Sequence, residues 1–208
     1  MAVADLEARR KAFGQGYQLT PVDRLGIWLN TRKIQALVGS FAAKTVADMG
    51  CGYNASFARN ILPEVHRAVV VDIALAPDLK NNDKVTAIEG TLPDALAGIA
   101  NGSIDIVVCS NVVEHLWEPL ATLREFRRIV GANGVVFINV PSWRGKWFLE
   151  FSAFRLGLSP AAEMNDHKMY YDPKDLWPLL VQAGFIPQCI RIGKHKLGLN
   201  TCAVCRVD

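Results

Sequence analysis

The fold of this chain is decided by the stretch Val46-Ala47-Asp48-Met49-Gly50-Cys51-Gly52-Tyr53-Asn54-Ala55. The short apolar run over residues 45–49 predicts a buried strand, and residues 53–61 predict a helix. Between them, Gly50 and Gly52 lack a Cβ, so the backbone can turn tightly and a ligand can approach it closely. The first amide groups of the helix would face that ligand with the positive end of the helix dipole. We therefore expect a nucleotide-type site on an α/β sheet.

Two kinds of cofactor use such a turn. The spacing Gly50-x-Gly52-x-x-Ala55 fits the relaxed dinucleotide fingerprint, and Asp72 closes the next predicted strand at 72 − 52 = 20 residues past Gly52. Asp48 favours the other kind, because a carboxylate beside the pocket would repel a pyrophosphate and attract the α-ammonium group of S-adenosylmethionine. A dinucleotide-dependent dehydrogenase and a glycine turn without any cofactor remain the alternatives.

The same stretch resembles motif I of the class I S-adenosylmethionine-dependent methyltransferases, D/E-x-G-x-G-x-G, with Asn54 in place of the third glycine. Residues 104–116 resemble the F-D-x-V-x-x-x-x-V-x-E-H-L segment of small-molecule methyltransferases, including the ubiquinone- and menaquinone-pathway enzymes. Residues 120–134 and 167–176 resemble two later segments of those enzymes. The resemblance extends from about Thr45 to the C-terminus. It implies an S-adenosylmethionine-dependent methyltransferase.

The resemblance also implies the fold. We expect an α/β, Rossmann-like seven-stranded methyltransferase sheet, with strand order 3-2-1-4-5-7-6, strand 7 antiparallel and helices on both faces. The strands are predicted at residues 45–49, 68–72, 84–89, 104–109, 135–140, 186–192 and 201–207. The helices are predicted at residues 2–13, 20–38, 53–61, 119–130 and 173–183, with Thr20 as an N-cap and Pro21 at the first helical position.

The chain is expected to form one domain over residues 1–208, since 208 residues suit one domain with a modest insertion. Residues 1–44 would be a helical addition, residues 45–208 the core, and residues 141–171 an insertion or lid after the fifth strand. That insertion carries aromatic and basic side chains, which favour a lid or wall for an apolar acceptor; plain packing and contact with lipid are the alternatives.

The resemblance implies a set of cofactor-binding residues. The acid that ends the second strand would accept hydrogen bonds from the ribose hydroxyls, and the turn after the third strand would contact the adenine. The fourth strand ends beside the transferred methyl group. The predicted residues are Asp48, Gly50, Cys51, Gly52, Asp72, Ile73, Thr91, Leu92, Ser110 and Asn111.

Methyl transfer requires a base only where the acceptor must lose a proton. The candidates are His115 and His167, because histidine alone has an unperturbed pKa near neutrality, and Glu114 would orient one of them. A packing role for His115 carries equal weight. Some related O-methyltransferases bind a divalent ion through E-x-x-E-H. Asn111 replaces the first glutamate here, so we predict no metal, with a weak site at Asn111, Glu114, His115 and His167 as the alternative.

Bulk properties exclude several classes of function. The net charge of +3 is too small to indicate binding to nucleic acid or an anionic membrane. Five cysteines without a framework spacing indicate a reducing, cytoplasmic environment. The charged N-terminal residues predict no secretory signal, and no apolar run is long enough for a membrane span. We expect a small apolar or amphipathic acceptor, with O-methylation favoured and peripheral contact with lipid open. A protein acceptor and a non-catalytic S-adenosylmethionine-binding module are the alternatives.

Overall fold

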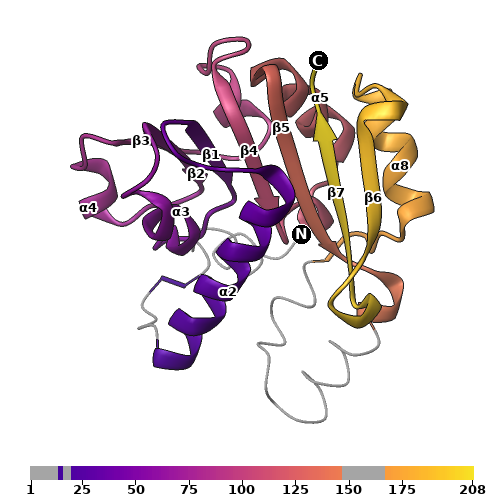
Figure 1. The fold of residues 1–208 in the computed structure, drawn as a ribbon, viewed down its shortest axis with the longest axis horizontal. Helices are drawn as coiled ribbons and strands as arrows, with labels where there is room; N and C mark the ends of the chain where they lie inside the picture. The colour runs from indigo at the N-terminus through magenta and orange to yellow at the C-terminus, as the bar shows by residue number, and fades with distance from the viewer. Residues whose placement is uncertain (1–13, 16–19, 147–166) are drawn as a thin grey trace, which may run out of the picture.

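The computed structural model describes residues 14–15, 20–146 and 167–208. The predicted helix over residues 2–13 and most of the predicted insertion, including its aromatic side chains at residues 147–154, lie outside these residues. Within them, a single sheet forms the centre of the molecule and helices lie on both of its faces (Figure 1).

The sheet has seven strands in the order β3-β2-β1-β4-β5-β7-β6. Strands β1 to β5 are parallel, and β7 is antiparallel to both β5 and β6. The predicted strand order and the antiparallel strand are therefore confirmed. The strands are β1 (Thr45–Met49), β2 (Arg67–Asp72), β3 (Val85–Glu89), β4 (Ile104–Ser110), β5 (Val130–Pro141), β6 (Ile190–His195) and β7 (Asn200–Arg206).

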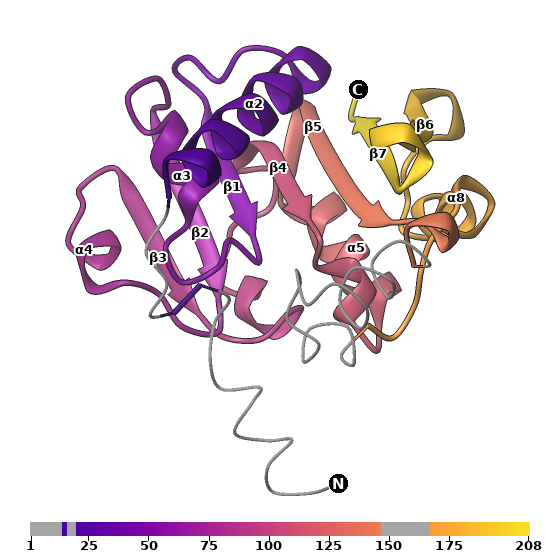
Figure 2. The same cartoon turned by 90° about the horizontal axis from the view of Figure 1, so that it is seen from below.

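Helices cover the two faces separately, as Figure 2 shows from below. On one face, Ile34 and Val38 of α2 pack with Ala58 and Ile61 of α3 over the sheet. On the other face, Leu123 and Phe126 of α5 are part of a second buried cluster, together with residues of α8. The helices are α2 (Pro21–Val38), α3 (Ser56–Ile61), α4 (Pro77–Lys80), α5 (Pro119–Ile129) and α8 (Pro173–Gln182). Among the described residues, no helix is long and apolar enough to cross a membrane.

Three predicted starts were wrong by more than one residue. The helix after the glycine turn begins at Ser56 rather than residue 53, because Ala55 has a left-handed conformation with φ 41°. Strand β5 begins at Val130 rather than residue 135, since the turn that we expected to precede it forms an irregularity in its pairing with β4. Strand β6 begins at Ile190 rather than residue 186, because residues 187–189 form a 3₁₀ turn that starts with Pro187. The predicted start of α2 is confirmed: Thr20 caps it and Pro21 is its first residue.

Candidate active site

A row of polar side chains marks one edge of the sheet. Asp72, Asp48, Ser110 and Asn139 stand at or near the carboxyl ends of β2, β1, β4 and β5. Side chains alternate along a strand, and the residue before each of these four belongs to the core on the α5 face. All four therefore point to the α2 and α3 face. The carboxyl edge of an open parallel sheet is where ligands bind in such folds.

The glycine turn is held against β2 and against the loop after β4. The backbone amides of Gly50 and Cys51 both donate to the carbonyl of Val71, at 2.8 and 3.2 Å. Gly50 has φ 67°, and a Cβ built on it would lie 2.2 Å from Val112 Cγ2. Glycine is thus required at position 50 for two reasons: the backbone angle is left-handed, and a side chain would clash with Val112.

The missing third glycine of the motif leaves the turn intact. Ala55, not Asn54, has the left-handed conformation, and it caps α3 without a side-chain hydrogen bond. Asn54 uses its amide group instead, donating to the carbonyl of Gly14 at 3.3 Å. The substitution therefore adds a link to the chain before α2 and imposes no backbone strain at residue 54.

Asp72 ties the glycine turn to the end of β2. One carboxylate oxygen accepts from the amide of Gly52 at 2.7 Å, and the other accepts from the amide of Ile73 at 2.8 Å. Burial raises the pKa of this carboxyl, while the hydrogen bonds from the amides of Gly52 and Ile73 lower it. Each carboxylate oxygen accepts more than one hydrogen bond, so Asp72 also has capacity for ribose hydroxyls.

Asp48 is a buried carboxyl with one unused oxygen. Its side chain is 6% exposed, and Oδ2 has no hydrogen-bond partner among the described residues. Burial, with a smaller contribution from the charge of Asp72, raises the pKa of Asp48 to about 7. A buried carboxylate of this kind is stabilised by a nearby cation. The two acceptor carboxylates of Asp48 and Asp72, together with the turn amides, therefore fit a ligand that has both an ammonium group and a ribose.

The other predicted cofactor residues lie along the same edge. Thr91 and Leu92 follow β3, where the amide of Gly90 donates to the carbonyl of Asp72 at 3.0 Å. The thiol of Cys51 donates to the carbonyl of Gly52 at 3.4 Å, and burial raises its pKa, so it is a packing group rather than a nucleophile.

Asn111 is fixed by a residue that the sequence analysis missed. The backbone amide of Asn111 donates to the backbone carbonyl of Asn139 at 2.8 Å, and the side-chain amide of Asn139 donates to Asn111 Oδ1 at 3.1 Å. These bonds hold Asn111 in a left-handed conformation with φ 56°. Asn139 is a polar residue inside an apolar strand, and that break in the pattern was the available signal.

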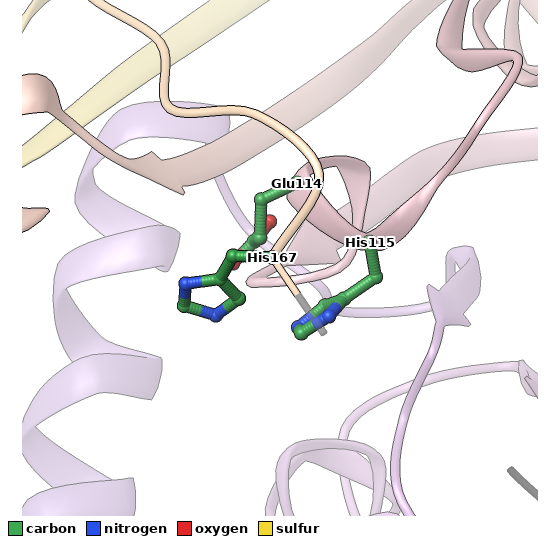
Figure 3. A group of neighbouring side chains, drawn as sticks. All are labelled: Glu114, His115 and His167. Atoms are coloured by element: carbon green, nitrogen blue, oxygen red, sulfur yellow. The ribbon is translucent and has the colours of Figure 1, made fainter. Parts of the chain in front are cut away.

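A second cluster joins two segments that are far apart in the chain. Figure 3 shows Glu114 and His115, from the turn η2 (Val113–His115), beside His167 from the segment before α8. The two imidazole rings are 4.7 Å apart between centroids. A backbone hydrogen bond holds the two segments together: the amide of Lys168 donates to the carbonyl of Glu114 at 2.7 Å.

Glu114 and Tyr170 border the two histidines. Glu114 is 1% exposed, and its Oε2 has no hydrogen-bond partner among the described residues. Burial raises the pKa of Glu114 to about 8, so the protonated form predominates at pH 7. On the other side, His167 Nδ1 lies 3.0 Å from the hydroxyl of Tyr170.

The cluster also has the composition of a metal site. One donor atom each from Glu114, His115 and His167 lies within 4.8 Å of the others. Two imidazoles and one carboxylate suit several divalent transition metals. This group contains Glu114, His115 and His167, three of the four residues considered for the alternative metal site. The prediction of a metal-free site therefore stays a prediction.

Comparison with known proteins identifies the class of protein. A family model described as a methyltransferase domain matches residues 24–189, so this chain belongs to the methyltransferase-domain family. It is 27% identical over 205 residues to the ubiquinone biosynthesis O-methyltransferase of Vibrio parahaemolyticus, covering 94% of this chain and 82% of that protein. It is 24% identical over 166 residues to a Mycobacterium tuberculosis protein named "probable S-adenosylmethionine-dependent methyltransferase", covering 76% of this chain and 56% of that relative.

Solved structures agree on the fold. An S-adenosylmethionine-dependent methyltransferase from Archaeoglobus fulgidus has a TM-score of 0.62 at 16% identity, with 86% of this chain and 94% of that chain covered. An O-methyltransferase family protein from Burkholderia thailandensis has a TM-score of 0.59 at 16% identity, with 89% and 60% covered. The predicted family and the predicted fold are both confirmed.

Proposed function

We propose that this chain is an S-adenosylmethionine-dependent methyltransferase that acts on an oxygen of a small, apolar or amphipathic acceptor. The observation that carries the proposal is the pairing of two sites on one edge of the sheet. The glycine turn with Asp48 and Asp72 suits the cofactor, and the cluster of Glu114, His115 and His167 suits an acceptor that must lose a proton.

On the cofactor side, the chain would supply fixed polar groups. Asp48 would face the ammonium group, and Asp72 would accept from the ribose hydroxyls while the amide of Gly52 holds it in place. Ser110 and Asn111 would border the reacting group at the end of β4. When bound, S-adenosylmethionine supplies a methyl group attached to a positively charged sulfur. Alignment of acceptor and cofactor is then the main contribution of the protein.

On the acceptor side, His167 is the preferred base. If Nδ1–H donates to the hydroxyl oxygen of Tyr170, Nε2 bears the lone pair that takes the proton from the acceptor hydroxyl. His115 stands edge-on to the same ring and would stabilise the resulting charge or share the proton. Glu114 lies beside them; burial raises its pKa to about 8 and disfavours its charge, and a positive imidazole next to it would act in the opposite direction.

The relatives named ubiquinone biosynthesis O-methyltransferases favour O-methylation of a small molecule, although their identity to this chain is only 24–28%. The test uses S-adenosylmethionine with a labelled methyl group and an extract of small molecules and proteins from the source cells. We expect the label in the solvent-extractable fraction, as a product one CH₂ heavier than a metabolite in the extract. Label confined to precipitated protein would indicate a protein methyltransferase, and label that stays on the cofactor would indicate a non-catalytic module.

A metal-assisted version of the reaction is the second candidate, and the donor cluster of Glu114, His115 and His167 is what favours it. We nevertheless expect activity to survive EDTA, because Asn111 replaces one carboxylate and Glu114 is mainly protonated near pH 7. Complete loss of activity on chelation, restored by one divalent ion, would assign these three residues to the metal instead.

A further inference from the structure

The tip of the β6–β7 hairpin exposes a leucine. Lys196 and Leu197 both have left-handed backbones, with φ 48° and 58°, and the side chain of Leu197 is 92% exposed. Neither residue is glycine, so this conformation is costly and persists only where the surroundings impose it. The turn η4 (Lys196–Gly198) thus presents an aliphatic side chain to solvent.

Helix α2 exposes a second group of apolar side chains. Leu25, Trp28 and Leu29 are 56%, 50% and 54% exposed. Their spacing of three and four residues puts them on one face of the helix, away from the buried Ile34 and Val38. A contiguous exposed group of large apolar side chains indicates an interaction surface rather than ordinary solvent exposure.

Basic side chains connect these two groups. Lys33 of α2 lies close enough to His195 and Lys196 that its charge, together with the larger effect of burial, lowers the pKa of both. Arg144 reaches the same turn, with a guanidinium nitrogen 3.6 Å from the position a Cβ on Gly198 would take. In the described part of the chain, Lys33, Lys196 and Arg144 form no ion pair. The net charge of the whole chain therefore conceals a local excess of positive charge.

The hairpin tip and the start of α2 lie toward the edge of the molecule that holds the candidate active site. Strand β7 begins at Asn200, which pairs with Pro141 at the carboxyl end of β5. Figure 1 shows the first turn of α2 extending toward the same side, below the carboxyl ends of the parallel strands. A flat partner that contacted both would lie next to the acceptor side of the site.

We propose that this surface docks on an anionic lipid bilayer, and we call it the basic–apolar surface. It consists of Leu25, Trp28, Leu29, Lys33, Lys196 and Leu197. The positive charges would face anionic headgroups, and the apolar side chains would enter the boundary between headgroups and acyl chains. The inference goes beyond methyl transfer and does not depend on it.

The chemistry of the surface favours a bilayer over other occupants. A symmetric contact with a second copy would place the same positively charged patch of each copy against the other, which like-charge repulsion opposes. A nucleic acid would use the cations and Trp28, yet it offers nothing to the exposed leucines. Lipid uses both kinds of group, and an apolar acceptor dissolved in the bilayer would then be delivered at the correct edge of the sheet.

The test is sedimentation of the full chain with vesicles of phosphatidylcholine alone or with one-third phosphatidylglycerol. We expect binding to the anionic vesicles that weakens as salt is raised. The double substitution Lys33→Gln and Lys196→Gln should lower the partition coefficient about thirtyfold, since each basic residue near an anionic surface contributes about a factor of five. Leu197→Asn should lower it by about tenfold while keeping the left-handed turn, which asparagine tolerates.

The matched control is the double substitution Arg67→Gln and Lys84→Gln, which removes the same charge near the amino ends of β2 and β3. It should leave vesicle binding within about twofold. Equal losses in control and test variants would reduce the effect to net charge and overturn the proposal. Absence of binding to either vesicle would overturn it too, as would a dimer in solution that Leu197→Asn dissociates. Unchanged binding of S-adenosylhomocysteine by the variants would show that they are folded.

Discussion

The cofactor side and the acceptor side of the candidate site are built in different ways. On the cofactor side, the polar contacts run through the backbone: the amides of Gly50, Gly52 and Ile73 are fixed by neighbouring carbonyl or carboxylate groups. On the acceptor side, side chains from separate segments meet, such as His115 and His167. A backbone-built site leaves a compact sequence motif, whereas a side-chain-built site becomes visible only after folding.

Because of this difference, substitutions on the two sides should have different effects on cofactor binding and on turnover. A change on the cofactor side should weaken cofactor binding, and turnover would fall as a consequence. A change on the acceptor side should lower turnover while S-adenosylhomocysteine still binds. The predictions below test that separation, from the largest expected effect to the smallest.

His167→Ala should lower turnover by about 10²- to 10⁴-fold, because it removes the proposed base. Its affinity for S-adenosylhomocysteine should stay within about threefold of the unsubstituted chain, as the structure places His167 among acceptor-side groups. Single-turnover rates and calorimetric titration measure the two quantities. His66→Ala, at an exposed position in the loop before β2, is the control and should change neither. Parallel loss of rate and affinity would remove His167 from the role of base.

Gly50→Ala should abolish cofactor binding at accessible concentrations and destabilise the fold by about 2–4 kcal/mol. The estimate combines the left-handed backbone with overpacking against Val112. Thermal and urea unfolding measure the stability. Gly98→Ala is the matched control, because a Cβ at Gly98 meets nothing within 4 Å. Equal stability of the two variants would mean that the turn is not constrained as described.

Asp72→Ala should weaken S-adenosylhomocysteine binding by about 1.5–3 kcal/mol, the usual size of hydrogen bonds to a charged group. Part of this loss would come from releasing the amide of Gly52. Calorimetric titration measures the change, and Asp78→Ala on the exposed side of α4 serves as the control. Normal binding by Asp72→Ala would refute the ribose assignment.

Cofactor affinity should also rise with pH between about 6 and 8. Burial gives Asp48 a pKa of about 7 in the free chain, so the carboxyl is partly protonated below that pH. A bound ammonium group would favour the charged form and lower the pKa, so binding would release a proton and strengthen up to tenfold per pH unit before levelling off above pH 7. Asp48→Asn should flatten the profile. An unchanged profile in that variant would place the ammonium group elsewhere.

The sequence predicted the cofactor side better than the acceptor side for the same physical reason. Gly50, Gly52 and Asp72 lie within a short stretch and its next strand, so their spacing indicated one shared site at this edge of the sheet; the structure brings them together, and their roles in cofactor binding stay predictions. The left-handed angle at Ala55 could not be predicted, because alanine carries no signal for it. On the acceptor side, the sequence named His115 and His167 as candidate bases and grouped them only through the alternative of a weak metal site. Their approach depends on the packing of residue 168 against Glu114, which no local pattern predicts.

The same reasoning explains two omissions. Asn139 fixes Asn111 across neighbouring strands, and it lies in a run that was interpreted only as an apolar strand. Leu197 lies at the tip of a hairpin that the sequence predicted. The first strand of that hairpin starts four residues later than expected. The contact of Asn139 with Asn111 depends on how neighbouring strands pair, and the exposure of Leu197 on the conformation of a turn; neither is set by a local pattern in the sequence.

The central claim is tested most directly by one calorimetric experiment on the purified chain, in which S-adenosylhomocysteine and NAD are titrated in turn under identical conditions. We predict saturable binding of S-adenosylhomocysteine with a dissociation constant on the order of micromolar, about −8 kcal/mol, and no heat of binding with NAD. Saturable binding of NAD with no response to S-adenosylhomocysteine would contradict the account.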